Sequence, residues 1–367
     1  MITSPLLDRC PEGLPRVAYV SADWFAREQA TVWARNWVMQ GRVSDMPKGR
    51  MRAVTVAGVP VLIARDAEGL VSAFHNVCRH RGAELCKGER EIGRLITCPY
   101  HAWAYATDGR LVSVGHATPT EDFVKEQNGL LPVSHLVWNG LLFVNLSATG
   151  PLLPDVGVEA LDNWPMDSLV TGHRHERLLN CNWKVFWENY SECLHCPGIH
   201  PELCDMVPVY AKGIMALEEV PEPSETGTRL KAGAQTWTPS GAPCGPVFDG
   251  LTDRQRLVGA NFATIWPTGY VVAHVDYVRA VWLEPVSATQ TRLVAEWYFS
   301  PETLAQPGFS AAGVASFASL VLDQDGDAAE MNQRGLASPA FSRGRLMPQE
   351  YEIHRFHQWV LAQMEDQ

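Results

Sequence analysis

Residues 78–82, CRHRG, and residues 98–103, CPYHAW, decide the fold of the N-terminal half of this 367-residue chain. Together they form the pattern C-x-H-x17-C-x2-H, with candidate ligands Cys78, His80, Cys98 and His101. Two thiolates and two imidazoles can hold one tetrahedral zinc ion, or a cluster in which two cysteines bind one iron and two histidines the other. The sequence therefore predicts a metal site built from two loops.

Two features of these loops favour iron and sulfur over zinc. Each loop pairs a cysteine with a histidine, whereas zinc fingers usually bring two cysteines together and two histidines together. Each pair also follows an expected strand and precedes a small residue, Gly82 or Ala102, so the ligands lie at loop tips. Structural zinc is the alternative that these observations leave open.

A second group of chemical residues lies in residues 182–203, NWKVFWENYSECLHCPGIHPEL, where Glu192, His195 and His200 form E-x2-H-x4-H. Asn189, Glu192 and His195 recur every three residues, which predicts one face of a helix. Two histidines and one carboxylate on one face of Fe(II) form the facial triad of non-haem oxygenases, which leaves positions open for dioxygen. The pattern therefore predicts a mononuclear iron site.

The two histidines need a turn between them to meet at one ion. In a continuous helix His200 would point about 140° away from His195. Pro197 and Gly198 interrupt the helical pattern, so the chain can turn and bring His200 back toward His195.

The carboxylate of the triad is expected from a helix over residues 321–336, which carries four acids: Asp323, Asp325, Asp327 and Glu330. Asp325 shares an inward stripe with Leu322 and Ala329. The other three acids lie on the opposite stripe, where Arg334 can pair with them in solvent. We therefore predict that His195, His200 and Asp325 bind the iron.

The loops CRHRG and CPYHAW closely resemble the cluster-binding loops of Rieske ring-hydroxylating oxygenases. Respiratory Rieske proteins add a cysteine pair that bridges their loops, whereas this chain has only Cys86 beyond them. The run QDGDAAEMNQRGL, residues 324–336, also resembles the ligand helix of the family, although Gln324 departs from the acid common there. The resemblance implies a Rieske [2Fe–2S] cluster on the four loop ligands and a mononuclear Fe(II), with imidazole ligation raising the cluster potential.

The resemblance also implies roles for the residues before His195. In the family, the acid at the position of Glu192 links a Rieske histidine of one subunit to the iron site of its neighbour, which implies a homo-oligomer, typically a trimer. Asn189 is the second candidate catalytic residue. Most relatives have aspartate at the position of Glu192, and the glutamate found here resembles the subgroup that oxidises quaternary ammonium compounds such as betaines, carnitine or stachydrine.

The implied activity is that of a Rieske-type non-haem iron monooxygenase or dioxygenase that uses O2 and electrons from NAD(P)H. A separate flavin and iron–sulfur reductase is expected, because no G-x-G-x-x-G follows an expected strand. The expected reaction is hydroxylation or oxidative N-demethylation of a small methylammonium compound. The alternatives are an aromatic or heteroaromatic ring hydroxylase and a Rieske electron carrier without catalysis.

Composition excludes some other classes. Lys and Arg total 30 against 41 Asp and Glu, and the resulting net charge of −11 disfavours nucleic acid. The start, MITSPLLDRCPEG, lacks a signal peptide, and no window reaches the ~18 apolar residues of a membrane span, so we expect a cytoplasmic protein. Nine cysteines, several beside histidine, favour metal ligation over a disulfide framework.

The sequence changes character near residue 150, which predicts two domains of an α+β protein. Short apolar runs separated by turn residues predict an all-β Rieske domain over residues 37–150. Residues 1–36 and 151–367 are assigned to a catalytic domain, and the resemblance implies a helix-grip-like fold with an antiparallel sheet and flanking helices. The expected strands and helices are at residues 51–64, 71–74, 94–97, 140–146, 182–193, 262–266, 270–284, 291–299 and 317–336.

Overall fold

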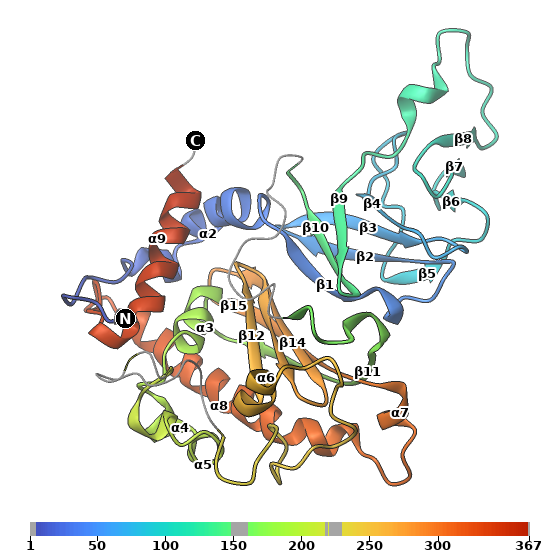
Figure 1. The fold of residues 1–367 in the computed structure, drawn as a ribbon. Coiled ribbons are helices and arrows are strands. Elements are labelled where there is room, and N and C mark those ends of the chain that lie inside the picture. The colour runs from blue at the N-terminus through green and yellow to red at the C-terminus, as the bar shows by residue number, and fades with distance from the viewer. Residues whose placement is uncertain (1–4, 148–160, 217–218, 220–229, 366–367) are drawn as a thin grey trace. The chain divides into compact units, whose positions relative to one another are not determined.

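The computed structural model describes residues 5–147, 161–216, 219 and 230–365 (Figure 1). Its contacts divide the chain into one unit of residues 33–153 and another that combines residues 1–32 with 154–367. The change of character predicted near residue 150 falls within residues 148–160, outside the described residues.

The first unit is built from short antiparallel strands. One sheet has the order β4-β3-β2-β5 and is formed by β2 (Arg50–Val56), β3 (Val59–Arg65), β4 (Val71–His75) and β5 (Glu89–Glu91). The β structure expected over residues 51–64 is confirmed as a hairpin, because β2 and β3 pair in continuous register from Arg50↔Arg65 to Val56↔Val59. Ala57 and Gly58 make its turn with φ angles of 49° and 74°.

Two further sheets complete this unit. They have the orders β6-β7-β8 and β1-β10-β9, and their strands are β1 (Val38–Arg42), β6 (Ile96–Thr97), β7 (Trp103–Tyr105), β8 (Leu111–Val114), β9 (Ser134–Trp138) and β10 (Leu141–Asn145). Met51, Phe74, Ile96 and Tyr105 pack in one hydrophobic core that joins the sheets carrying the two cysteine loops. The unit is the all-β domain that the sequence predicts.

The second unit is organised around a five-stranded antiparallel sheet of order β11-β15-β14-β13-β12 (Figure 1). Its strands are β11 (Val170–Leu179), β12 (Ala260–Ile265), β13 (Gly269–His274), β14 (Val278–Ser287) and β15 (Gln290–Phe299). Residues 270–284, predicted as one β-rich run, divide into β13 and β14. Strand β11 was not predicted, because its sequence VTGHRHERLL places polar side chains on both faces.

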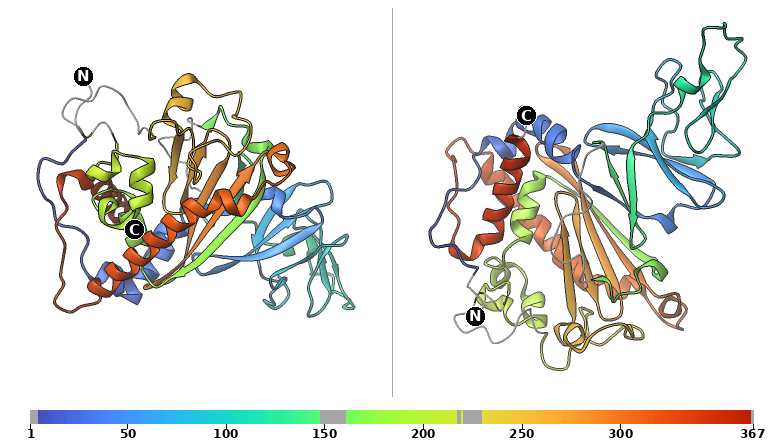
Figure 2. Two further views of the ribbon diagram at one scale, coloured as in Figure 1. Left: turned by 90° about the horizontal axis from the view of Figure 1, so that it is seen from below. Right: turned by 45° about the horizontal axis from the view of Figure 1, so that its top comes forward.

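The α-helices of the described residues all belong to the second unit. They are α1 (Val17–Val20), α2 (Ala22–Glu28), α3 (Trp183–Tyr190), α4 (Cys196–Ile199), α5 (Pro201–Met206), α6 (Asp253–Val258), α7 (Pro301–Leu304), α8 (Ala311–Leu336) and α9 (Tyr351–Glu365). Figure 2 shows the long helix α8 running along the sheet, where it contacts β11 and α3. Among the described residues, no helix combines the length and the apolar character needed to cross a bilayer.

Gly326 lets helix α8 approach β11 closely. A Cβ atom at this position would lie 2.8 Å from Cδ2 of Leu179 and 2.8 Å from Nη1 of Arg177. A side chain there would have to displace the ends of the Arg177 and Leu179 side chains, so the glycine permits this close packing next to Asp325.

A fully buried ion pair ties α2 to α3. Nζ of Lys184 lies 2.6 Å from Oε1 of Glu28, and both side chains are fully buried. Glu28 also accepts hydrogen bonds from the indole N–H groups of Trp24 and Trp183. Burial of a charged pair is tolerated only when such hydrogen bonds accompany it, so this carboxylate organises the start of the second unit.

Candidate functional site

The two cysteine loops of the β unit have matching backbone conformations. The carbonyl oxygens of Cys78 and Cys98 accept hydrogen bonds from the N–H groups of Gly82 and Ala102, at 3.0 and 3.1 Å. Gly82 and Ala102 both adopt positive φ angles, 78° and 56°. The loops are therefore two copies of one tight turn, each with a cysteine at its base.

The four predicted ligands separate into an inner and an outer pair. Cys78 and Cys98 are buried and their side chains interact, whereas the imidazoles of His80 and His101 have centroids 4.8 Å apart on the more exposed side. Trp103 stacks on His80 with an interplanar angle of 10°. This pairing of sulfur with sulfur and nitrogen with nitrogen is the ligand arrangement of a Rieske cluster.

The same geometry argues against a single zinc ion. A tetrahedral zinc needs its ligand atoms within roughly 4 Å of one another, given Zn–S and Zn–N bonds of about 2.0–2.3 Å. Within the described ranges, the one group of at least three metal-ligating side chains whose ligand atoms all lie within 4.8 Å of one another is found elsewhere in the chain. The loop residues thus fit a cluster with two irons.

Tyr105 supports the inner pair, and sequence reasoning missed it. Its hydroxyl oxygen lies 3.2 Å from Sγ of Cys78 and accepts a hydrogen bond from the N–H of Arg79. Burial raises the pKa of the Cys78 thiol. The hydroxyl is therefore placed to donate a hydrogen bond to the thiolate form, as expected around cluster sulfurs.

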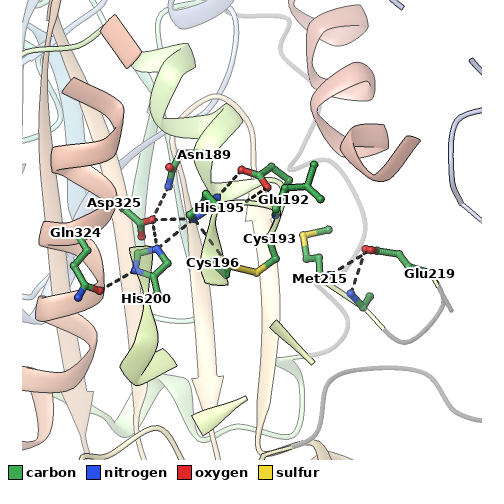
Figure 3. The surroundings of a disulfide bond; sticks show 12 residues. Asn189, Glu192, Cys193, His195, Cys196, His200, Met215, Glu219, Gln324 and Asp325 are labelled. Atoms are coloured by element: carbon green, nitrogen blue, oxygen red, sulfur yellow. Dashed lines mark hydrogen bonds and ion pairs between the residues drawn. A yellow bond between two sulfur atoms is a disulfide. The ribbon is translucent and has the colours of Figure 1, made fainter. Parts of the chain in front are cut away.

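His195, His200 and Asp325 meet at one point of the second unit (Figure 3). Nε2 of His200 lies 2.9 Å from Oδ1 of Asp325 and 3.2 Å from Nε2 of His195. The remaining pair, Nε2 of His195 and Oδ1 of Asp325, is 3.5 Å apart. Two imidazole nitrogens and one carboxylate oxygen thus converge. This donor set suits a non-haem Fe(II) whose remaining coordination positions are open to other ligands.

Hydrogen bonds orient each of these three side chains. Nδ1 of His195 donates to Oε1 of Glu192 at 2.5 Å, and Nδ1 of His200 donates to Oε1 of Gln324 at 2.8 Å. Both imidazoles consequently turn Nε2 toward the common point (Figure 3). Asn189 donates from Nδ2 to Oδ1 of Asp325 at 2.5 Å. Such outer partners fix the tautomer and direction of metal ligands.

The charges at this point are mutually stabilised. Burial alone would raise the pKa of Asp325, but hydrogen bonds from His195 and His200 lower it to about 2. Burial alone would lower the pKa of His195, but hydrogen bonds to Asp325 and Glu192 raise it to about 9. Without iron, the Asp325 carboxylate is therefore ionised and His195 protonated at neutral pH, and iron binding would displace the proton from Nε2 of His195.

The local backbone differs from the expected helix, which was to carry Asn189, Glu192 and His195 on one face. Helix α3 ends at Tyr190, so Glu192 and His195 lie in a loop rather than on a helical face. The Glu192 carboxylate accepts hydrogen bonds from the backbone N–H groups of Leu194 and His195, and these bonds replace helical ones. Pro197 and Gly198 lie within the short helix α4 rather than in the predicted turn, and the helix ends at His200.

Two other details correct the sequence analysis. Asp323 and Asp327 pair with Arg177 of β11, at 3.6 and 2.5 Å, rather than with Arg334. Cys193 and Cys196 form a disulfide beside His195, although the sequence favoured metal ligation over disulfides (Figure 3). The C-x2-C spacing, which is typical of local redox pairs, is the signal in the sequence that could have indicated this disulfide.

The triad opens on a cavity of about 1100 Å³. Its wall includes the aromatic residues Tyr190, Tyr210, Trp237, Phe262, Trp266, Tyr270 and Trp359. The rings of Tyr190 and Tyr270 are stacked with centroids 4.0 Å apart. The cavity is large enough for a small organic molecule, and its aromatic faces can attract an organic cation.

Comparison with known proteins identifies both units. Residues 166–366 match the model of the ring hydroxylating alpha subunit catalytic domain, and residues 36–126 match that of the Rieske [2Fe-2S] domain. The chain is 27% identical over 390 residues to the glycine betaine monooxygenase oxygenase subunit of Pseudomonas aeruginosa, covering 96% of this chain and 89% of that one. It is 28% identical over 358 residues to the chloroplastic choline monooxygenase of Beta vulgaris, covering 94% and 76%.

A solved structure shows the same fold. The quaternary ammonium Rieske monooxygenase CntA, in complex with its substrate L-carnitine, superimposes with a TM-score of 0.71. The sequences are 22% identical, and the match covers 97% of this chain and 96% of CntA. The α+β architecture predicted from the sequence is thereby confirmed.

Proposed function

This chain belongs to the ring-hydroxylating alpha-subunit family, and on that premise we propose that it is a terminal oxygenase that oxidises a small quaternary ammonium compound. One observation carries the proposal: His195, His200 and Asp325 converge at the wall of a cavity lined by aromatic rings. The reaction proposed is hydroxylation or oxidative N-demethylation of a methyl group on nitrogen.

The enzyme is an oxidoreductase, and its two metal cofactors are a Rieske [2Fe–2S] cluster and a mononuclear iron. When bound, the iron supplies dioxygen activation and the cluster supplies electrons to it. Cys78, Cys98, His80 and His101 would hold the cluster, while His195, His200 and Asp325 would hold the iron. An electron carrier without catalysis does not fit a chain whose second half matches a catalytic domain.

The chain's own residues position these groups. Glu192 and Gln324 hold the two iron-binding imidazoles with Nε2 directed inward, and Asn189 holds Asp325. We also assign Glu192 to the electron path from the Rieske histidine of a neighbouring subunit, in a homotrimer. The hydrogen bond between the Glu192 carboxylate and His195 supports this assignment, because it gives Glu192 a direct link to one iron ligand.

The substrate class rests on relatives and on the cavity. The relatives are named for glycine betaine, choline and carnitine, all quaternary ammonium compounds. The stacked Tyr190 and Tyr270 rings line the cavity with the triad, and ring faces stabilise a methylated ammonium group. An aromatic ring hydroxylase is the second candidate, favoured by the same apolar faces.

Oxygen consumption tests the proposal. The holoenzyme, a surrogate reductase and NADH are mixed with glycine betaine, carnitine or choline, or with arenes such as benzoate. We expect oxygen uptake and formaldehyde or a hydroxylated amine from at least one ammonium compound. His200→Ala should abolish this activity, and Asp323→Asn should keep it, because Asp323 points away from the triad to β11. Diol or phenol formation from arenes alone would overturn it.

The remaining assignments are part of the same proposal. Electrons come from NAD(P)H through a separate reductase, and the enzyme acts in the cytoplasm. Reductase dependence is tested directly, since the purified chain with NADH alone should show no turnover.

A further inference from the structure

A buried arginine lies on the wall of the catalytic cavity without an ionic partner. Arg279 is on β14, only 5% of its surface is exposed, and it lines the cavity together with His195 and Asp325. None of the described residues forms an ion pair or hydrogen bond with its side chain, and Nε is buried and unbonded. Its guanidinium carbon lies 6.0 Å from the ring centroid of Trp297.

Two other arginines of the same unit have carboxylate partners. Arg174 pairs with Glu176 and Glu296, and Arg355 pairs with Glu352 at 3.5 Å. An arginine cannot relieve its burial by losing a proton, and an unpaired buried charge is strongly unfavourable. A buried guanidinium that faces a ligand cavity therefore indicates an anion as its missing partner.

The other unbonded atoms of the cavity wall point to the same chemistry. Among the described cavity residues, the buried side-chain atoms that lack a hydrogen-bond partner are Nε of Arg279, Nε1 of Trp237, Nε1 of Trp266 and Nδ2 of Asn261. All four are donors. The triad carboxylate Asp325 and its neighbour Glu192 are already engaged by histidine. A ligand that forms hydrogen bonds with these donors must provide acceptor atoms such as carboxylate oxygens.

Strand register places this arginine beside the aromatic pair. Arg279 is opposite Val272, and Tyr270 is opposite Val281, so Arg279 and Tyr270 are diagonal neighbours on one face of the sheet. Tyr270 lies within electrostatic range of both Arg279 and Asp325. Tyr270 of the stacked pair thus lies close to Arg279 on the sheet and lines the same cavity as the iron ligands.

We propose that Arg279 binds the carboxylate of the substrate, so that the substrate is a zwitterionic quaternary ammonium acid rather than a cationic alcohol. The ammonium group then lies against Tyr190 and Tyr270, with its methyl groups toward the triad. The indole N–H of Trp237 supplies a second donor for the substrate carboxylate. Trp237 packs against Phe262, and Phe262 and Arg279 are both paired with Val272, on opposite sides of β13. This inference rests on the proposed function and specifies its substrate class.

Equilibrium binding to the oxidised holoenzyme tests the inference without turnover. Isothermal titration compares glycine betaine and longer trimethylammonium acids with their primary amides, which keep the size and the cation but lose the negative charge. Wild type should bind at least one acid roughly 10-fold or more tightly than its amide, as expected for a charge-assisted hydrogen bond. Equal binding of acids and amides would overturn the inference, with no variant needed.

Variants assign the preference to Arg279. Arg279→Gln should weaken binding of the acid roughly 10- to 100-fold and bring the acid-to-amide ratio close to one. Arg279→Lys should keep part of the preference, and the matched control Arg292→Gln, at a half-exposed arginine on β15, should keep all of it. An unchanged ratio in a folded Arg279→Gln enzyme would contradict the assignment.

A third ligand separates failure of this inference from failure of the proposed function. The compound 3,3-dimethylbutanoate has the shape and carboxylate of glycine betaine but no positive charge. If it binds as tightly as betaine and its binding depends on Arg279, the anion site stands and the quaternary ammonium function fails. If amides and choline bind and turn over as well as acids, the function stands and the anion site fails.

Discussion

Oε1 of Glu192 accepts a hydrogen bond from Nδ1 of His195 at 2.5 Å, and both residues belong to the loop that places the His195 imidazole beside His200 and Asp325. This contact fixes the tautomer of His195 and leaves Nε2 to face His200 and Asp325. One carboxylate thereby touches an iron ligand through its side chain and stabilises the loop through backbone N–H groups. The geometry links the position of Glu192 to the orientation of one iron-binding imidazole.

Glu192→Gln should separate these two roles. The amide oxygen can still accept from His195, so both metals should remain bound, whereas loss of the charge should slow electron transfer from cluster to iron by at least about 10-fold. Stopped-flow reoxidation of the reduced cluster with substrate and oxygen measures this rate, and metal analysis confirms loading. If the iron-loaded Glu192→Gln variant reoxidised its cluster at the wild-type rate, Glu192 would have no role in electron transfer.

Asp325→Ala should empty the mononuclear site and leave the cluster intact. The variant loses one of three protein ligands, so iron content should fall by about one per chain while the cluster spectrum is unchanged. Asp323→Asn is the matched control, since its carboxylate is half-exposed and contacts His175 and Arg177 instead. Full iron retention in Asp325→Ala would refute the ligand assignment.

Cys98→Ser should remove the cluster, whereas Cys86→Ala should not. Both cysteines are buried near the loops, but Sγ of Cys86 faces the backbone carbonyl of Gly88 at 3.5 Å rather than Cys78. Visible absorption and acid-labile sulfide report the cluster. Equal loss of sulfide in both variants would mean that the loop spacing does not define the ligand set.

Glu28→Gln should strongly destabilise the second unit. The substitution leaves the ammonium group of Lys184 buried without its counter-charge, and breaking such a pair costs about 3–5 kcal/mol of unfolding free energy. Denaturant unfolding followed by circular dichroism measures the change. Glu12→Gln, at a half-exposed pair with Arg345, should cost less than about 1 kcal/mol. Similar losses of unfolding free energy in the two variants would contradict the greater importance of the buried pair.

The site could be predicted from sequence wherever the chemistry depends on spacing within one segment. The loops at Cys78 and Cys98 and the pair His195 and His200 are local patterns, and helical phase selected Asp325 among four acids. The end of α3 at Tyr190 was not predictable in this way, because the hydrogen bonds that replace the helix come from the Glu192 side chain.

Features that depend on pairing between distant segments could not be predicted. Strand β11 has polar residues on both faces. It forms a strand because it pairs with β15 and contacts α8, and both partners are distant in sequence. The isolation of Arg279 depends on which residues lie opposite it on β13 and β15, namely Val272 and Trp297. A one-dimensional pattern contains neither relationship.

Mössbauer spectroscopy of the protein expressed with 57Fe tests the central claim most directly, since it counts and distinguishes both iron sites in one sample. We predict about two irons in a cluster with one histidine-ligated site, and about one further high-spin mononuclear iron per chain that disappears in Asp325→Ala. Zinc in the loop site, or cluster iron with no mononuclear component in fully loaded wild type, would contradict the account.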